Sequence, residues 1–256
     1  MIVGIVPMGG MGERWAPYPG PKELVPFGVD SVGRPLVIAD HVIQRMERAG
    51  VDQIVIPVRA EKAGQVMGYF GHRRKSGAII IYVAAPGPSL IANVQACIPL
   101  LGSNTVLFGM PDTYFTPAEA FTACLGQLAD GIEVVLGCWE QDNPAELDTV
   151  DRVGHVVRAV KPKPRAVDDD LKEAWGIAVW SGTFTARFRA WSDPDRPNPG
   201  FVFASAADEG LARAVGFSAG SYLDIGGYRQ YENGLVALRN RPADADASEI
   251  APDSDV

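Results

Sequence analysis

Short apolar runs alternate with amphipathic segments along the first half of the chain. The runs are rich in β-branched residues, which favours strands over 2–8, 53–58, 78–83 and 105–110. The segments between them carry apolar residues at helical spacing, over 35–50, 60–71 and 89–101. Nearly continuous apolar strands separated by helices indicate a parallel sheet covered on both faces. The pattern therefore predicts a doubly wound, mostly parallel, Rossmann-like α/β fold.

The same rhythm continues after residue 111 and then loosens. A helix is expected over 116–130 and a strand over 133–139, followed by β-rich, proline-containing sequence. The last predicted elements are a short helix near 204–214, a strand near 215–225 and a helix near 227–238. The second half is thus expected to add a smaller β-rich portion to one domain spanning 1–240. The stretch 241–256 is acidic and poor in large apolar side chains, which predicts a disordered tail.

Composition and charge limit the kinds of partner that the chain is expected to bind. The 256 residues carry a formal net charge of −8, which argues against nucleic acid as the main partner because phosphate backbones need a cationic face. No apolar run approaches the roughly 20 residues of a membrane span, and the first residues, "MIVGIVPM", lack a basic signal region. Three widely spaced cysteines indicate core packing in a reducing compartment. We therefore expect a cytoplasmic protein that binds neither membranes nor nucleic acid.

The segment 9–28, "GGMGERWAPYPGPKELVPFG", follows the first predicted strand. Ligands of open α/β sheets bind beyond the carboxyl ends of the strands, where glycines let backbone amides approach phosphates. The segment is neither a dinucleotide fingerprint, because Trp15 stands at the third glycine position, nor a P-loop. Its prolines exclude a helix directly after the glycines. Arg14 and Lys22 add two cations that suit a nucleoside triphosphate.

The sequence "GIVPMGGMGERWAPYPGPKELVPFG" resembles the signature of the sugar-1-phosphate nucleotidyltransferases, the glucose-1-phosphate thymidylyl- and uridylyltransferase group. That signature combines GGxGTR, a proline and PKxLxP. The matching positions are Gly9, Gly10, Gly12, Arg14, Pro17, Pro21, Lys22, Leu24 and Pro26. Glu13 replaces the usual threonine, which places a carboxylate near the expected anion.

Three later segments extend the resemblance to about residue 238. "VLFGMPDTYFTP" and "SYLDIGGYRQY" are similar to the segments that supply two Mg²⁺-binding aspartates, matching Asp112 and Asp224. An aspartate at a strand end is by itself usually a cap or turn residue, so the pair carries the functional interpretation. "VVRAVKPKP" resembles the segment whose lysine holds the sugar phosphate, matching Lys161, with Lys163 as the alternative. "WGIAVW" resembles the sugar-contacting strand, with Gly176 as the close-approach glycine.

The resemblance implies an Mg²⁺-dependent enzyme that joins a nucleoside triphosphate, with dTTP or UTP favoured, to a sugar 1-phosphate and releases pyrophosphate. It implies a nucleotide-binding half over 1–115, a sugar-phosphate-binding half over 116–240 and a homo-oligomer. Five residues receive catalytic roles, two of them as metal ligands: Arg14, Lys22, Asp112, Lys161 and Asp224. Nucleotide-binding positions are Met8, Gly9, Gly10, Gly12, Glu13, Ala84 and Ser89.

Two departures leave alternatives open. Ala84 stands where the family has the glutamine that reads the base, and Val160 where it has a sugar-binding glutamate. One alternative is a transferase that uses CTP or another triphosphate with an alcohol phosphate or an unusual sugar. The other is a non-catalytic regulatory protein that binds nucleotide sugars.

Overall fold

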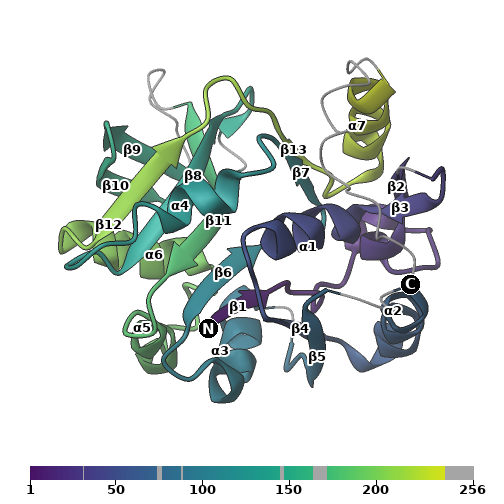
Figure 1. The fold of residues 1–256 in the computed structure, drawn as a ribbon, viewed down its shortest axis with the longest axis horizontal. Helices are drawn as coiled ribbons and strands as arrows, with labels where there is room; N and C mark the ends of the chain where they lie inside the picture. Colours follow the sequence, from purple (N-terminus) through teal and green to yellow (C-terminus); the bar gives the residue numbers. More distant parts are fainter. Residues whose placement is uncertain (31, 74–76, 88, 145–146, 164–171, 240–256) are drawn as a thin grey trace, which may run out of the picture.

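The computed structural model describes residues 1–30, 32–73, 77–87, 89–144, 147–163 and 172–239. A nine-stranded sheet runs through both halves of the chain in the order β5-β4-β1-β6-β11-β8-β12-β10-β9 (Figure 1). The predicted tail over 241–256 lies outside the described residues. Within the described part of the chain, no helix is both long and apolar enough to cross a membrane.

The first half of the sheet is parallel, as predicted. It consists of β1 (Ile2–Ile5), β4 (Gln53–Val58), β5 (Ile79–Ala84) and β6 (Thr105–Gly109). β1 pairs in parallel with both β4 and β6, and β4 pairs in parallel with β5. Because these strands run the same way, their carboxyl ends lie along one edge of the sheet. The segments that follow β1, β5 and β6 therefore meet at that edge.

The second half corrects the prediction of a mostly parallel sheet. It consists of β8 (Val134–Glu140), β9 (Thr149–Val153), β10 (Val156–Lys161), β11 (Glu173–Trp180) and β12 (Ala212–Gly216). β11 runs antiparallel to β6, β8 and β9, and only β8 and β12 pair in parallel. The short turn between β9 and β10, with Gly154 at φ 58°, forces an antiparallel hairpin. The pairing of β11 with both β8 and β9 closes these five strands into a small barrel.

Helices cover both faces of the sheet, which confirms the doubly wound layering. One core cluster contains residues of α1 (Ile38–Arg48), α2 (Ala60–Arg73) and α4 (Ala120–Leu125). The other contains residues of α3 (Leu90–Leu101), α5 (Thr185–Ala190) and α6 (Pro199–Asp208). The free thiols of Cys97, Cys124 and Cys138 are buried in these clusters, as expected of core cysteines.

A third apolar cluster supports the glycine-rich segment. The segment forms two single-turn 3-10 helices, Glu13–Trp15 and Lys22–Leu24, followed by the hairpin β2 (Pro26–Val29) and β3 (Pro35–Val37). Its buried side chains pack with α7 (Tyr228–Arg239) and with a two-stranded sheet of β7 (Thr113–Phe115) and β13 (Tyr222–Asp224). The start of the predicted helix over 35–50 is thus a strand, because Pro35–Val37 pairs with β2. This cluster joins the start, middle and end of the chain.

Candidate active site

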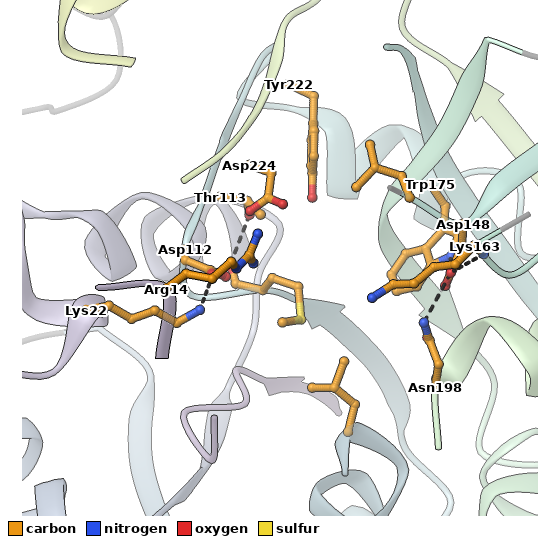
Figure 2. A pocket seen from close by; sticks show the side chains of 13 residues that line it. Arg14, Lys22, Asp112, Thr113, Asp148, Lys163, Trp175, Asn198, Tyr222 and Asp224 are labelled. Carbon is orange, nitrogen blue, oxygen red and sulfur yellow. Dashed lines mark hydrogen bonds and ion pairs between the residues drawn. The ribbon is translucent and has the colours of Figure 1, made fainter. Parts of the chain in front are cut away.

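A cavity of about 690 Å³ opens where the segments after β1, β5 and β6 meet the second half of the sheet. Figure 2 shows its polar side chains in two groups. Arg14, Lys22, Asp112 and Asp224 form one group, which we call the acid-pair end. Asp148, Lys163, Trp175 and Asn198 form the other, which we call the far end. The hydroxyl of Tyr222 points into the space between them.

Asp112 and Asp224 lie together although 112 positions separate them in the sequence. Asp224 is the last residue of β13 and pairs with Thr113, the residue after Asp112. The Ile225 amide also donates a hydrogen bond to the Asp112 carbonyl oxygen, at 2.8 Å. Antiparallel pairing of β7 with β13 thus fixes the two aspartates side by side. The structure brings this predicted pair into one cavity.

The two carboxyl groups repel each other in a partly desolvated place. Burial and then the charge of Asp112 raise the pKa of Asp224, while Arg14 and Lys22 act to lower it. The Lys22 ammonium forms an ion pair with the Asp112 carboxylate. Burial alone would lower the pKa of Lys22, but Asp112, Glu23 and Asp224 together outweigh burial, so the pKa is raised. The acid-pair end therefore favours additional positive charge.

Arg14 reaches Asp224 across a glycine. A side-chain Cβ at Gly226 would lie 2.2 Å from an Arg14 guanidinium nitrogen and 2.9 Å from an Asp224 carboxylate oxygen. Only a residue without a Cβ leaves this space to the guanidinium. Gly226 is therefore the residue that admits Arg14 to the acid-pair end, and the sequence analysis did not single it out.

The glycine-rich loop has open space around it. A Cβ at Gly10 or Gly12 would meet no atom within 4 Å, and Gly12 has the left-handed φ of 72°. Lys62 of α2 ties this loop to the second half of the segment, donating to the Gly10 carbonyl at 3.0 Å and to the Glu23 carboxylate at 2.6 Å. These contacts fix a loop whose glycines leave open space beside the backbone, and phosphate binding by backbone amides requires such close access.

Gly9 and Met8 are packed against other residues of the chain and have no open space beside them. A Cβ at Gly9 would lie 2.5 Å from the Asn93 side-chain amide, and Met8 is fully buried beside Val58. Glu13 is exposed and is not among the residues that line the cavity. Gly10 and Gly12 are likewise absent from the cavity lining, whereas Arg14 and Lys22 belong to it. The phosphate contacts predicted for the loop glycines stay predictions.

Asp148 dominates the far end of the cavity. Its side chain is buried, and its Oδ1 accepts hydrogen bonds from the Lys163 amide at 3.2 Å and the Asn198 side chain at 3.1 Å. Its Oδ2 accepts from the Trp175 indole at 3.2 Å. Burial raises the pKa of Asp148, and these donors together with the charge of Lys163 oppose the rise. The sequence analysis did not assign a role to Asp148 or Asn198.

Lys163 lines the cavity, and Lys161 does not. Lys161 ends β10 and pairs with Thr149, whereas Lys163 follows the strand with a φ of 38°. Figure 2 shows the Lys163 amino group directed into the cavity. Of the two lysines that the sequence offered, the structure therefore brings the alternative one to the site.

Three other predicted residues lie outside the cavity lining. A Cβ at Gly176 would lie 2.1 Å from the Tyr222 ring, so the group that approaches this glycine is a tyrosine of the same chain. Ala84 is exposed at the end of β5. Ser89 caps α3 by accepting from the Ala92 amide at 3.3 Å. Their predicted ligand contacts stay predictions.

The donor set suits a hard divalent cation. Within the described ranges, no group of three or more His, Cys, Asp or Glu side chains could hold a metal ion. Mg²⁺ is commonly held by one or two carboxylates together with substrate phosphates. Asp112 and Asp224 offer oxygen ligands only, and their mutual repulsion would be relieved by a cation. The residues present therefore fit Mg²⁺ bound together with a phosphate ligand.

The overall structure resembles solved nucleotidyltransferases, while no family model and no curated protein matches the sequence. A structure from Bacillus anthracis, assigned as a glucose-1-phosphate thymidylyltransferase and solved with sucrose, has a TM-score of 0.81 at 16% identity. The match covers 94% of this chain and 97% of that one.

Two Acinetobacter baumannii structures, a UTP-bound UGPase and a UDP-glucose pyrophosphorylase, have TM-scores of 0.73 and 0.71, each at 16% identity. Each match covers 97% of this chain, and it covers 97% and 98% of the respective neighbour. The alignments thus span nearly the whole of both partners, including the small barrel. The chain has the fold of the sugar-1-phosphate nucleotidyltransferases.

Proposed function

We propose that this chain transfers a nucleotidyl group from a nucleoside triphosphate, dTTP or UTP by preference, to a sugar 1-phosphate. In this reaction a phosphate oxygen of the acceptor attacks the α-phosphorus and pyrophosphate leaves. The observation that carries the proposal is the meeting of Asp112 and Asp224 with Arg14 and Lys22 in one cavity beside the glycine-rich loop. These two cations and two carboxylates come from three segments that are far apart in the sequence.

The acid-pair end is proposed to hold the triphosphate. Both reactants are anions, so the protein must mainly align them and neutralise charge. Arg14 presents a planar guanidinium to the phosphates, and Lys22 adds a compact positive charge beside Asp112. Gly10 and Gly12 have open space on their Cβ side, and their backbone amides are the donors that would bind phosphate oxygens.

Asp112 and Asp224 are proposed to hold Mg²⁺ together with the triphosphate. When bound, the ion would neutralise phosphate charge and polarise the reacting phosphorus. The two carboxylates contribute the fixed, close-set oxygen ligands that this role requires, and Lys22 would then share Asp112 with the ion.

Lys163 is proposed to hold the acceptor phosphate. It is the cation at the far end of the cavity, and its amino group faces the acid-pair end across the open volume (Figure 2). An anionic acceptor placed between Lys163 and Arg14 would be oriented from both sides. Lys161, which the resemblance favoured, stays a candidate only for indirect support of this segment.

Ala84, at the position of the family's base-reading glutamine, is exposed and has no polar side chain. CTP and purine triphosphates therefore belong in the test beside dTTP and UTP, and alcohol phosphates beside sugar 1-phosphates.

The proposal is tested by measuring pyrophosphate release from dTTP, UTP, CTP, ATP and GTP. Each triphosphate is paired with glucose 1-phosphate, galactose 1-phosphate, N-acetylglucosamine 1-phosphate, glycerol 3-phosphate or phosphocholine, with Mg²⁺ or with EDTA. Mg²⁺-dependent release with a sugar 1-phosphate supports the proposal. Nucleotide binding without release from any pair contradicts it and supports a non-catalytic protein.

A further inference from the structure

Asp148 is a buried carboxylate that lines the cavity. The proposed nucleotidyl transfer assigns it no role in the chemical step. It lies at the far end, beyond Tyr222 from the acid pair (Figure 2). We propose that Asp148, held by Asn198 and Trp175, is the specificity-determining residue for the acceptor and accepts hydrogen bonds from hydroxyl groups of its sugar ring. This inference rests on the proposed function, because it concerns the acceptor of that reaction.

The hydrogen bonds of Asp148 leave acceptor capacity on one oxygen. An ionised carboxylate has about four lone-pair positions. Oδ1 uses two, for the Lys163 amide and the Asn198 side chain, and Oδ2 uses one, for the Trp175 indole. The Gly200 backbone lies close to Oδ2, since a Cβ there would be 2.3 Å from it. Donors from the described residues leave one acceptor position unused, and because Asp148 lines the cavity, a ligand there could take it.

The protein partners of Asp148 also leave its negative charge available. All three hydrogen-bond donors are neutral: a backbone amide, an indole and a carboxamide. A ligand hydroxyl would thus form a charge-assisted hydrogen bond, which is stronger than one between neutral groups. A cationic ligand fits less well, because Lys163 brings a positive charge to the same end of the cavity. Neutral hydroxyl donors are the chemistry that this end favours.

Trp175 adds an apolar surface beside that acceptor. Its indole lines the cavity and is held by ring contacts with Phe203, at 5.1 Å between centroids, and Phe108, at 6.2 Å. A sugar ring has C–H faces as well as hydroxyl groups, so a fixed aromatic wall next to a carboxylate matches both. Because the indole N–H is committed to Asp148, the wall and the acceptor keep one orientation relative to each other.

The two ends belong to one continuous cavity, which residues of both groups line together with Tyr222. The Tyr222 hydroxyl points into the space between them (Figure 2). A single acceptor could therefore place its phosphate toward the acid pair and its ring toward Asp148. The class of acceptor that uses both ends is a sugar 1-phosphate with free ring hydroxyls.

The test combines the isosteric variant Asp148→Asn with acceptors that lack single hydroxyls. Glucose 1-phosphate and its 2-, 3-, 4- and 6-deoxy analogues serve as probes, with kcat/KM for the acceptor as the readout. We expect the wild type to lose about 10- to 100-fold with the analogue that lacks the contacted hydroxyl, and Asp148→Asn to lose a similar factor with the parent sugar. For Asp148→Asn, kcat/KM with that analogue should be less than about threefold below kcat/KM with the parent sugar.

Two further variants separate recognition from structural support. Asp151→Asn makes the same chemical change on β9 outside the cavity lining and should leave every ratio unchanged. Asn198→Ser keeps a side-chain oxygen to cap α6 but removes the amide that orients Asp148, and it replaces Asp148→Asn if that variant does not fold. It should weaken discrimination at the same hydroxyl by about 3- to 10-fold and leave the KM for the triphosphate unchanged.

One outcome would overturn the inference while the proposed function stands: Asp148→Asn discriminates against every deoxy analogue as strongly as the wild type does. Use of only glycerol 3-phosphate or phosphocholine, which have no sugar ring, would contradict the sugar 1-phosphate acceptor of the proposed function and, with it, this inference. Absence of pyrophosphate release with all acceptors would instead contradict the proposed function itself.

Discussion

Both ends of the cavity contain buried carboxylate groups, but the groups that stabilise their charge differ. At the acid-pair end, Asp112 and Asp224 face each other and are balanced by Lys22 and Arg14. At the far end, the described lining residues include no acid besides Asp148, which is held by neutral donors. The first arrangement calls for cations and phosphates, since like charges in a desolvated place repel. The second retains one oxygen position for a neutral hydroxyl donor.

The same difference appears in how the ends are built. The acid-pair end depends on a two-stranded sheet and a glycine that admits an arginine, so its geometry is set by backbone pairing. The far end depends on side-chain hydrogen bonds between β11, α6 and the segments before β9 and after β10. Variants at the first should therefore affect the chemical step, and variants at the second the choice and affinity of the acceptor.

Removal of one acid of the pair should have the largest effect. Asp112→Asn keeps the shape but removes the charge that pairs with Lys22 and that the proposed Mg²⁺ would need. We therefore expect pyrophosphate release to fall by roughly 10²-fold or more at saturating substrates. The measurement is kcat with an active triphosphate and acceptor. Asp151→Asn, outside the cavity lining, should stay within about twofold of the wild type. Near-normal release by Asp112→Asn would remove the basis for treating this end as the chemical one.

The two lysines after β9 sharpen the comparison next. Lys163→Met should raise the KM for the acceptor about 10- to 100-fold, because an ionic hydrogen bond to the acceptor phosphate is lost. Lys161→Met is the matched control two residues away and should change this KM by less than about threefold. A larger effect at Lys161 than at Lys163 would mean that the acceptor phosphate binds outside the cavity described above.

A methyl group at Gly226 should have a smaller effect, confined to the chemical step. Gly226→Ala places a Cβ 2.2 Å from the Arg14 guanidinium, whose flexible side chain can move away. We expect kcat to fall roughly tenfold with little loss of thermal stability, because Arg14 is displaced. Gly227→Ala serves as the control, because the atom nearest to its Cβ is the side-chain oxygen of Gln230. Equal kcat values for the two variants would argue against a role for Arg14 in the chemical step.

The smallest effect concerns the stability of the far end as pH changes. Burial raises the pKa of Asp148, so ionisation favours the unfolded chain. The contribution of this group to stability is present below the ordinary pKa of aspartate and is lost as pH rises through the raised value. The free energy of unfolding of the wild type minus that of Asp148→Asn should therefore decrease with rising pH across this window, in urea titrations. An increase would show that the hydrogen bonds outweigh burial.

Much of the site could be read from the sequence because it is local. The glycines, Arg14 and Lys22 lie in one short segment after the first strand, and Asp112 ends another strand of the same parallel half. The carboxyl ends of parallel strands share an edge, so these residues meet once the strand order is known. Asp224 was predicted from its flanking motif, and the β7–β13 pairing explains why that position lies beside Asp112.

The far end was hidden for a physical reason. Asp148 and Asn198 carry no motif of their own, and they meet only because the antiparallel second half brings β11 and α6 against the start of β9. The same rearrangement places Lys163 in the cavity and leaves Lys161 in the strand pairing. A one-dimensional pattern predicts strands but not the partners of an irregular barrel, since several pairings bury the same apolar side chains.

The amino-acid order by itself determined the parallel half, its two helical layers and the chemistry gathered at the first strand's carboxyl end. Periodicity and local backbone preference act over a few residues, so they survive without knowledge of distant contacts. The tertiary structure alone decided the direction of β11, the closure of the barrel and the side chains that line the far end of the cavity. Those depend on contacts between residues far apart in the chain, whose free energy is settled only when all layers pack at once.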